Sequence, residues 1–251
     1  MSSEATESDP MATLCRLLER APGWSAVEVS TGGLRLEGIS KSYRGVTALD
    51  EVSLVVKPGD VQLLVGPNAS GKTTLGRVAV GLTDPDRGEI DGPVDGLGYA
   101  FQDPRYYPSL TVEEHLRTVR AIQGSERVAP EWSQALAEAL RLDRVAHQPA
   151  AELSGGFQKK LDIAIGLLAR PRYVWLDEPL ADLDELSVDR IVRLVEAYRE
   201  AGGAVIIGTH HPQAFLEVAT QVTLFRDGCT RGPIPIQQYD PERSIETYFA
   251  D

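Results

Sequence analysis

The sequence has little cysteine, no long apolar run and a shortage of basic residues. Only two of its 251 residues are cysteines, Cys15 and Cys229, and they lie far apart along the chain. Two free thiols in a reducing compartment are the simplest interpretation, although other pairings stay open. No apolar run approaches the roughly 18 residues that indicate a membrane-spanning helix. We therefore expect no membrane span within this sequence.

The charge balance limits the partners that the chain can bind. The sequence holds 25 Lys and Arg against 37 Asp and Glu, which gives a formal net charge of −12. General nucleic-acid binding needs a basic surface, so we predict no nucleic-acid partner, although a local basic patch stays open. The first ten residues carry three acids and no Lys or Arg, the opposite of a signal peptide. The expected location is therefore cytoplasmic.

Strand and helix patterns alternate along most of the chain, as in an ordinary globular protein. The predicted strands cover residues 34–39, 53–56, 61–65, 88–90, 97–101, 173–176, 204–208 and 221–225. The predicted helices cover residues 75–80, 110–116, 132–140, 156–169 and 185–200. Alternating strands and helices form parallel sheets. We predict an α/β fold with a mostly parallel sheet and a helical insert at about residues 104–169.

Residues 1–33 form a predicted N-terminal extension ahead of the first strand. Met11, Leu14 and Leu18 recur at helical spacing, and Pro22-Gly23 would end this helix. A helix that docks on a partner and a helix that lies on its own domain both fit the pattern. The second interpretation is favoured.

The stretch after the strand 61–65 has a recognisable chemistry. Residues 66–74, GPNASGKTT, fit G-x-x-x-x-G-K-[ST] between a strand and a helix, and we call this stretch the P-loop. The glycines let successive N–H groups point inward, and the helix N-terminus adds positive potential where phosphates would lie. Lys72 would reach the β- and γ-phosphates, and the Thr73 hydroxyl would bind Mg²⁺. A glycine-rich turn that binds nothing would have no use for this Lys-Thr pair.

Two carboxylates follow the apolar strand 173–176. Asp177 and Glu178 would lie at the carboxyl edge of a parallel sheet, where ligands bind. Asp177 is placed to hold Mg²⁺ through water, and Glu178 is placed to act as a general base toward an attacking water. The alternative is a pair of acids that only ends the strand, and the nearby P-loop makes it less favoured.

A third stretch, residues 153–157 with the sequence LSGGF, begins a predicted helix. Ser154 and the glycines Gly155 and Gly156 leave a hydroxyl and N–H groups free to bind an anion. In isolation the same pattern would fit a plain helix N-cap. Its position about twenty residues before Asp177 favours the anion-binding interpretation over a plain N-cap.

With these residues in view, the chain resembles the nucleotide-binding subunits of ABC (ATP-binding cassette) transporters over about residues 34–232. The matching positions, in the family's order, are Tyr43 (adenine-stacking aromatic), 66–74 (Walker A), Gln102 (Q-loop), 153–157 (signature), 174–178 (Walker B), 181–184 (D-loop) and His210 (switch histidine). The resemblance implies a P-loop NTPase fold with an antiparallel β subdomain beside the main sheet. Residues 233–251 would form a C-terminal tail.

The resemblance also implies which residues bind and cleave ATP. It implies catalytic roles for Glu178, His210 and Gln102. It implies Mg²⁺ contacts for Thr73, Gln102 and Asp177. The implied nucleotide-binding residues are Tyr43, Gly66, Pro67, Asn68, Ala69, Ser70, Gly71, Lys72, Thr73, Thr74, Ser154, Gly155 and Gly156. ATP and Mg²⁺ are the expected cofactors.

The partners and the function also come from the resemblance. Two cassettes would close over two ATP molecules, each lying between Lys72 of one chain and residues 154–156 of the other. The second ATP-binding subunit would be identical or different. Polytopic membrane subunits, encoded separately, would hold the chain at the inner face of the cell membrane. The expected function is ATP hydrolysis that powers transport, with export favoured over import on residues 110–116. The alternative is a soluble ABC-type ATPase, such as a cofactor-assembly scaffold.

The sequence shows three departures from the family pattern, at four positions. Phe157 replaces the usual Gln of the signature, Lys159-Lys160 replaces Gln-Arg, and His211 follows the switch histidine where an acid is common. None of these changes removes a catalytic group, so we expect a competent ATP site. Phe157 would alter either the contact across the dimer or only the packing of its own helix.

Overall fold

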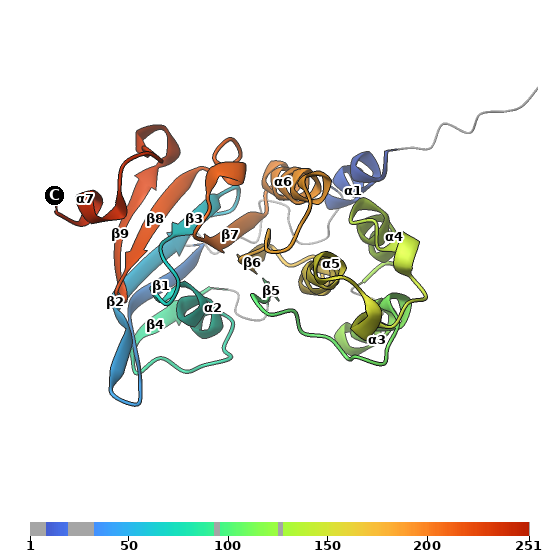
Figure 1. The fold of residues 1–251 in the computed structure, drawn as a ribbon, viewed down its shortest axis with the longest axis horizontal. Helices are drawn as coiled ribbons and strands as arrows, with labels where there is room; N and C mark the ends of the chain where they lie inside the picture. Colours follow the sequence, from blue (N-terminus) through green and yellow to red (C-terminus); the bar gives the residue numbers. More distant parts are fainter. Residues whose placement is uncertain (1–8, 20–32, 93–95, 125–127, 251) are drawn as a thin grey trace, which may run out of the picture.

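The computed structural model describes residues 9–19, 33–92, 96–124 and 128–250. Its main sheet consists, in spatial order, of β5 (Leu97–Ala100), β6 (Tyr173–Asp177), β7 (Ala204–Thr209), β3 (Val61–Val65), β8 (Gln221–Arg226) and β9 (Cys229–Pro235). Neighbouring strands are parallel from β5 to β8, and the edge strand β9 is antiparallel to β8. Figure 1 shows the helices around this sheet. The predicted α/β fold with a mostly parallel sheet is confirmed.

A smaller antiparallel sheet lies beside the main sheet. It consists of β2 (Val46–Val56), β1 (Leu34–Tyr43) and β4 (Arg87–Asp91) in that spatial order. Strands β1 and β2 are longer than the alternating patterns predicted, because their polar ends still pair with each other as far as Tyr43 and Val46. The predicted turns at residues 31–33 and 91–96 lie partly outside the described residues.

The helices follow the predicted order closely. They are α1 (Pro10–Glu19), α2 (Lys72–Ala79), α3 (Val112–Gln123), α4 (Pro130–Ala139), α5 (Gly155–Leu167), α6 (Glu185–Glu200) and α7 (Ile245–Ala250). Short 3₁₀ turns lie at residues 143–145, 150–152, 213–215 and 236–238. Thr111 and Glu114 form the predicted capping box at the start of α3. Helices α3, α4 and α5 occupy the predicted insert, and strand β9 crosses the predicted boundary between residues 232 and 233.

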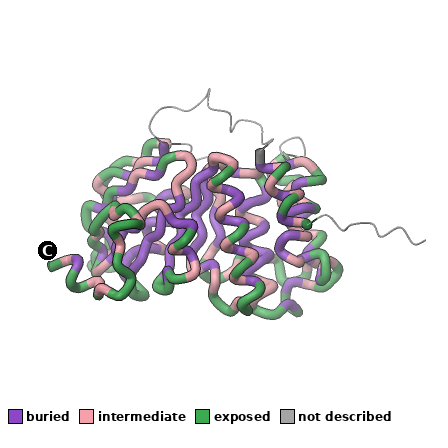
Figure 2. Tube along the Cα trace, turned by 90° about the horizontal axis from the view of Figure 1, so that it is seen from above, coloured by how far each residue is buried: buried purple, intermediate pink, exposed green. Residues whose placement is uncertain are grey.

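The main sheet is buried on both faces, which fixes the register of its strands. Along β3 every residue is buried. Leu63 and Val65 pack into a core shared with α6 and the helical insert, whereas Leu64 packs into a second core with α2 and the smaller sheet. Figure 2 shows the buried chain running through the middle of the molecule. Since alternate side chains face opposite sides, a one-residue slip would exchange the two cores.

Helix α1 lies on its own domain, as the favoured interpretation predicted. Its buried side chains Met11, Leu14 and Leu18 belong to the larger core. The helix packs against α4 and α6, as Figure 1 shows. Asp9, just before the helix, pairs with Arg193 of α6 at 3.1 Å. The apolar face of α1 therefore forms part of the larger core.

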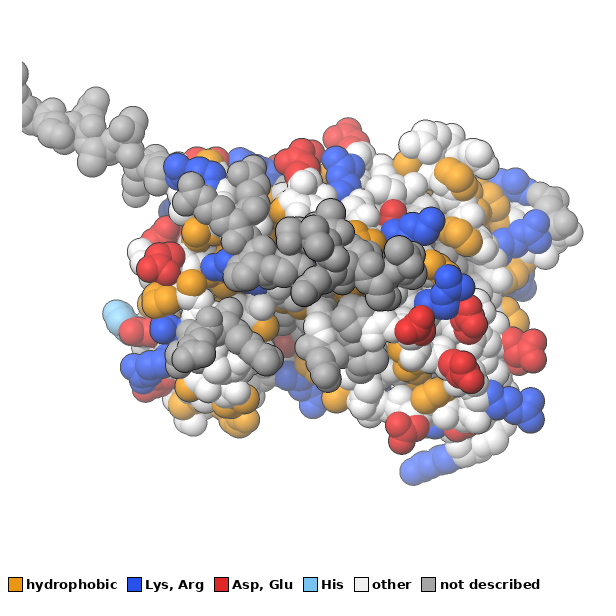
Figure 3. All heavy atoms as spheres, turned by 180° about the vertical axis from the view of Figure 1, so that it is seen from behind, with side chains coloured by type: hydrophobic (Ala, Val, Ile, Leu, Met, Phe, Trp, Pro, Cys, Tyr) orange, Lys and Arg blue, Asp and Glu red, His pale blue; other side chains and the backbone are white. Residues whose placement is uncertain are grey.

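Charged side chains of both signs are interspersed on the surface seen in Figure 3. Among the described residues, no helix is both long enough and apolar enough to cross a membrane.

Candidate functional site

The P-loop joins β3 to α2 at the carboxyl edge of the main sheet. Gly71 has a φ of 113°, and a Cβ at this position would lie 2.7 Å from the carbonyl oxygen of Ala48. A side chain is therefore excluded here by both backbone conformation and space. Lys72 follows as the first residue of α2, so its N–H lies at the positive end of the helix. The loop has the geometry that phosphate binding requires.

The Lys72 ammonium forms hydrogen bonds with the backbone at the start of the P-loop. Its Nζ donates to the carbonyl oxygens of Gly66 at 2.7 Å and Pro67 at 3.0 Å, and it lies 4.0 Å from Glu178 Oε1. Burial lowers the pKa of Lys72, while the charges of Glu178 and Asp177 act in the opposite direction. A nearly buried cation beside two acids is suited to exchange its carbonyl partners for phosphate oxygens.

A cavity of about 430 Å³ opens beside the P-loop. The lining residues are Val46, Thr47, Ala48, Asn68, Ala69, Ser70, Gly71, Lys72, Thr73, Thr74, Gln102 and Glu178. The cavity thus brings together most of the predicted P-loop residues, Gln102 and Glu178. Tyr43 is not a lining residue: it is 44% exposed at the end of β1 and pairs with Val46, which lines the cavity.

Asp177 ends β6 below this cavity with only 1% of its surface exposed. Its Oδ2 accepts a hydrogen bond from the Tyr99 hydroxyl at 3.3 Å, and burial raises the pKa of its carboxyl. Its Oδ1 is buried and makes no hydrogen bond of ordinary length among the described residues, although the Thr73 hydroxyl lies close enough to oppose the rise in the pKa of the carboxyl. A buried carboxylate oxygen without such a hydrogen bond is suited to a cation or to a water bound to a cation.

Thr73 and Gln102 lie across from this carboxylate. The Thr73 hydroxyl donates to Gln102 Oε1 at 3.4 Å. Both residues line one small pocket together with Asp177. Three oxygen-bearing side chains predicted to contact Mg²⁺ therefore converge from three separate elements. We call residues 101–105, which follow β5, the Gln102 loop.

Glu178 is held in an unusual backbone conformation. Its φ is 46°, in the left-handed region that side chains other than glycine rarely adopt, and its N–H donates to Gly208 O of the neighbouring strand at 2.8 Å. His210 Nδ1 lies 2.8 Å from Glu178 Oε1, and the contact is a hydrogen bond when this nitrogen carries the proton. The His210 ring lies 4.0 Å from that of His211, measured between centroids. Backbone strain at a carboxylate that faces the P-loop is typical of a functional site.

The signature residues lie apart from this cavity. Ser154 caps α5, where its Oγ accepts from the Phe157 N–H at 3.4 Å. Gly155 and Gly156 lie against Asp182, and a Cβ on Gly156 would come within 3.0 Å of the Asp182 carbonyl oxygen. None of these three signature residues lines the P-loop cavity. One chain therefore presents its P-loop and its signature on separate surfaces.

Two departures from the family pattern, Phe157 and Lys160, contact each other on helix α5. The Phe157 ring is half-buried against the larger core, and Lys160 Nζ lies 3.7 Å from its centroid, a cation–π contact. The sequence did not single out the structural roles of Tyr99, Lys159 and Asp162. A signal was available for the last two, since charged residues at core positions of a helix indicate specific partners.

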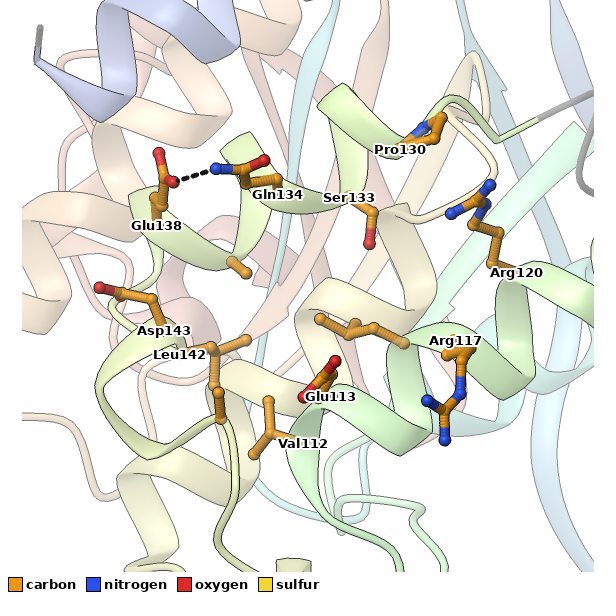
Figure 4. Close-up of a pocket in the computed structure, with 13 residues that line it drawn as sticks. Val112, Glu113, Arg117, Arg120, Pro130, Ser133, Gln134, Glu138, Leu142 and Asp143 are labelled. Carbon is orange, nitrogen blue, oxygen red and sulfur yellow. Dashed lines mark hydrogen bonds between the residues drawn. The ribbon is translucent and has the colours of Figure 1, made fainter.

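A second cavity of about 440 Å³ lies between α3 and α4 (Figure 4). Apolar side chains such as Val112 and Leu142 line it, and Gln134 Nε2 donates to Glu138 Oε1 at 2.8 Å beside it. It shares no lining residue with the P-loop cavity. The two cavities are similar in size, so it is the phosphate-binding chemistry that assigns the site to the P-loop.

The fold and this site define an ATP-binding cassette with a P-loop, and comparisons with known proteins agree. The family model described as ABC transporter matches residues 49–181. A probable ABC transporter ATP-binding protein of Azorhizobium caulinodans is 30% identical, over 95% of this chain and 89% of that protein. The lipopolysaccharide export system ATP-binding protein LptB of Escherichia coli K12 is 30% identical, over 78% of this chain and 87% of that protein.

Other similar proteins extend this comparison. The ribose import ATP-binding protein RbsA 1 of Rubrobacter xylanophilus is 34% identical, over 86% of this chain but 48% of that protein. A solved ATP-binding subunit of an ABC transporter has a TM-score of 0.72 at 24% identity, over 86% of this chain and 98% of that one. A bacterial ABC transporter cassette solved as a dimer has a TM-score of 0.72 at 24% identity, over 82% of this chain and all of that one.

The chain belongs to the ABC transporter family, and it is an ATP-binding subunit that hydrolyses ATP. The resemblance that the motifs indicated is therefore confirmed. The relatives include both an export and an import protein, so they leave the direction of transport open.

Proposed function

We propose that the P-loop cavity binds Mg²⁺-ATP and that its hydrolysis powers transport through separate membrane subunits. The observation that carries the proposal is the convergence of Lys72, Glu178 and the Thr73–Gln102 pair on one cavity. Residues 66–74 would hold the phosphates through backbone N–H groups, with Lys72 neutralising their charge. Tyr43 would stack on the adenine from the rim of the cavity.

Mg²⁺ fits Thr73, Gln102 and Asp177, three of the side chains that line the small pocket adjoining this cavity. The donor set is oxygen only: the Thr73 hydroxyl, the Gln102 amide oxygen and the buried Asp177 carboxylate. Mg²⁺ prefers such ligands, keeps several waters and is completed by substrate phosphates. When bound, it would neutralise charge that develops on the phosphate oxygens. Thr73 and Gln102 would contact it directly, and Asp177 through water.

Glu178 would accept the proton of the attacking water. The Glu178 carboxylate lies at the cavity wall, and its contact with His210 at 2.8 Å fixes its direction. His210 would thereby orient Glu178 and, with Gln102, contribute to a geometry suited to in-line attack on the terminal phosphate. The strained backbone at Glu178 supports this assignment, because such strain is retained where geometry matters.

A second cassette would complete the site. Ser154, Gly155 and Gly156 lie outside the P-loop cavity of their own chain, at the N-terminus of a thirteen-residue helix. The proposal places them against the ATP of a partner cassette, identical or different, where the helix N-terminus would bind the terminal phosphate. The dimeric cassette of similar fold supports such an assembly.

The Gln102 loop and the segment after it would dock a polytopic membrane subunit and hold the chain at the inner membrane face. A cavity of about 360 Å³ lies there, and its lining includes Tyr106, Tyr107 and His115. His115 is almost fully buried and accepts from the Tyr107 N–H at 2.8 Å, so it fixes the backbone of this surface. The Tyr107 side chain is 61% exposed, an apolar group suited to an interface.

Crosslinking tests the membrane partner. In a chain whose exposed Cys229 is replaced by Ser, Tyr106→Cys and Ser109→Cys should each crosslink to one polytopic membrane protein in native membranes. Asp227→Cys, on an exposed side chain away from this surface, serves as the matched control. Crosslinks from both positions to soluble proteins alone would contradict the membrane role and favour a soluble ABC-type ATPase.

Export is the proposed direction of transport. The support is the resemblance of residues 110–116 to the helical domain of exporter-type cassettes. The match to LptB, named for an export system, is consistent with this direction. In inside-out vesicles that carry the membrane partner and this subunit, ATP should drive uptake of the cargo. ATP-dependent loss of preloaded cargo from those vesicles would indicate import.

A further inference from the structure

Helix α5, which begins at the signature, also binds the Gln102 loop: two side chains of the helix form hydrogen bonds with backbone atoms of the loop. Lys159 Nζ donates to the carbonyl oxygens of Phe101 at 2.8 Å and Gln102 at 2.6 Å. Three residues on, Asp162 accepts the N–H groups of Phe101 at 2.5 Å and Arg105 at 2.9 Å. One buried cation and one buried anion of the same helix therefore bind both the donors and the acceptors of this loop.

The burial of this pair indicates a specific use. Lys159 and Asp162 are only 3% and 2% exposed, so these two charged side chains are almost as buried as the apolar residues Leu161 and Ile163 beside them. Burial lowers the pKa of Lys159 and raises the pKa of Asp162 to about 6. Buried charges oppose folding unless their contacts compensate, and apolar residues would pack here at lower cost. The contacts that distinguish the pair are those with the Gln102 loop.

Gln102 links this pair to the nucleotide site. Its carbonyl oxygen accepts from Lys159, while its side-chain oxygen accepts from the Thr73 hydroxyl at 3.4 Å. We propose that Lys159 and Asp162 are positioning residues that hold Gln102 against Thr73 and so set how strongly Mg²⁺ tightens nucleotide binding. This inference rests on the proposed role of Gln102 in the Mg²⁺ site. It also connects helix α5, and the signature at its start, to the nucleotide in the same chain.

The neighbouring lysine provides a matched control. Lys160 is buried to nearly the same extent, at 5% exposed, and follows Lys159 on α5. Its ammonium contacts the Phe157 ring and lies 3.5 Å from Ser187 Oγ. Lys160→Met and Lys159→Met therefore remove equivalent buried charges, and only the second removes hydrogen bonds to the Gln102 loop.

The test compares nucleotide binding with and without the metal. The affinity of a non-hydrolysable ATP analogue is measured by calorimetry in Mg²⁺ and in EDTA. The readout is the dissociation constant in EDTA divided by the dissociation constant in Mg²⁺, which is large when the metal tightens binding. Lys159→Met and Gln102→Ala should each reduce this ratio about fivefold or more, the effect of losing one hydrogen bond. Lys160→Met should leave it within about twofold, the range of a change that removes no such bond. Lys159→Arg, which can still donate to two carbonyls, should restore most of it.

A double variant separates positioning from a general loss of stability. If Lys159 acts through Gln102, adding Lys159→Met to Gln102→Ala should reduce the ratio no further. Should Lys159→Met fail to fold, Asp162→Asn takes its place, with the same fall in the ratio and faster amide hydrogen exchange at residues 101–105 expected.

Three outcomes would contradict the positioning role or the proposed role of Gln102. A normal ratio in both Lys159→Met and Asp162→Asn, with a reduced ratio in Gln102→Ala, would overturn the positioning role and leave the proposed role of Gln102 standing. A normal ratio in Gln102→Ala would instead overturn the proposed role of Gln102 itself. An equal fall in Lys160→Met would show that the loss of any buried charge suffices, which would also overturn the positioning role.

Discussion

Replacing Lys72 with Met tests the assignment of the P-loop cavity to nucleotide phosphates. The change keeps the unbranched apolar stem and removes the ammonium, which now donates to Gly66 O at 2.7 Å and Pro67 O at 3.0 Å. On nucleotide binding this ammonium would exchange a carbonyl for a charged phosphate oxygen. A hydrogen bond to a charged group contributes roughly 1.5–3 kcal/mol, so ATP affinity should fall about 10- to 160-fold.

The assay for Lys72→Met is equilibrium binding of a fluorescent ATP analogue, with ATP hydrolysis measured in parallel. Lys57→Met is the matched control, because Lys57 is exposed in the turn before β3, at the opposite end of that strand. The control should bind ATP as the unmodified chain does. An unchanged affinity and turnover in Lys72→Met would refute the phosphate assignment and with it the reason for choosing this cavity.

Three further predictions concern adenine, the N-terminal helix and pH. Tyr43→Ala should weaken ATP binding by roughly 1–3 kcal/mol, as the loss of a base–aromatic stack does, while Tyr43→Phe and Tyr43→Trp should be nearly neutral; equal affinities in all three would exclude stacking. Leu14→Ala removes a fully buried side chain of α1 and should lower the free energy of unfolding by about 2–5 kcal/mol in urea titrations. Arg16→Ala, exposed on the same helix, should change it by less than about 0.5 kcal/mol, and equal effects would mean that α1 does not pack on the domain. Because the pKa of the Asp162 carboxyl is raised from 3.8 to about 6 in the folded chain, its stabilising contribution is present below pH 3.8 and is lost as pH rises through about 6. Asp162→Asn should therefore gain stability relative to the unmodified chain, by about 2 kcal/mol, as pH rises from 4 to 7, and a constant difference would contradict the burial of an ionised Asp162.

The sequence predicted the parts of this molecule that depend on local patterns. The P-loop, the capping box of Thr111 and Glu114, and the helix Glu185–Glu200 all lie where the sequence placed them. Each is determined by residues close together along the chain: a glycine where φ is positive, a side chain that caps a helix, or apolar residues at helical spacing. Strand β2 was predicted too short, since its exposed first half is paired with β1 and is not buried.

The contacts that position the site could not be predicted in this way. Lys159 and Gln102 are 57 residues apart, and Tyr99 and Asp177 are 78 residues apart. Periodicity indicates which face of a helix is buried but not which atoms it meets. The same limit applies to Phe157, whose Lys160 partner lies one turn along its own helix but whose packing depends on the fold.

The central claim is that Glu178 is the base of an ATP site completed by a second chain. Glu178→Gln keeps the size of the side chain and removes its basicity, so hydrolysis should fall by about 100- to 10,000-fold while ATP binding persists. The Glu178→Gln chain should then form an ATP-dependent dimer, measured by light scattering at high protein concentration. Adding Ser154→Arg should prevent this dimer, because the larger side chain would occupy the space beside Gly155 and Gly156. A Glu178→Gln chain that hydrolyses ATP at the unmodified rate as a monomer would contradict both the base and the two-chain site.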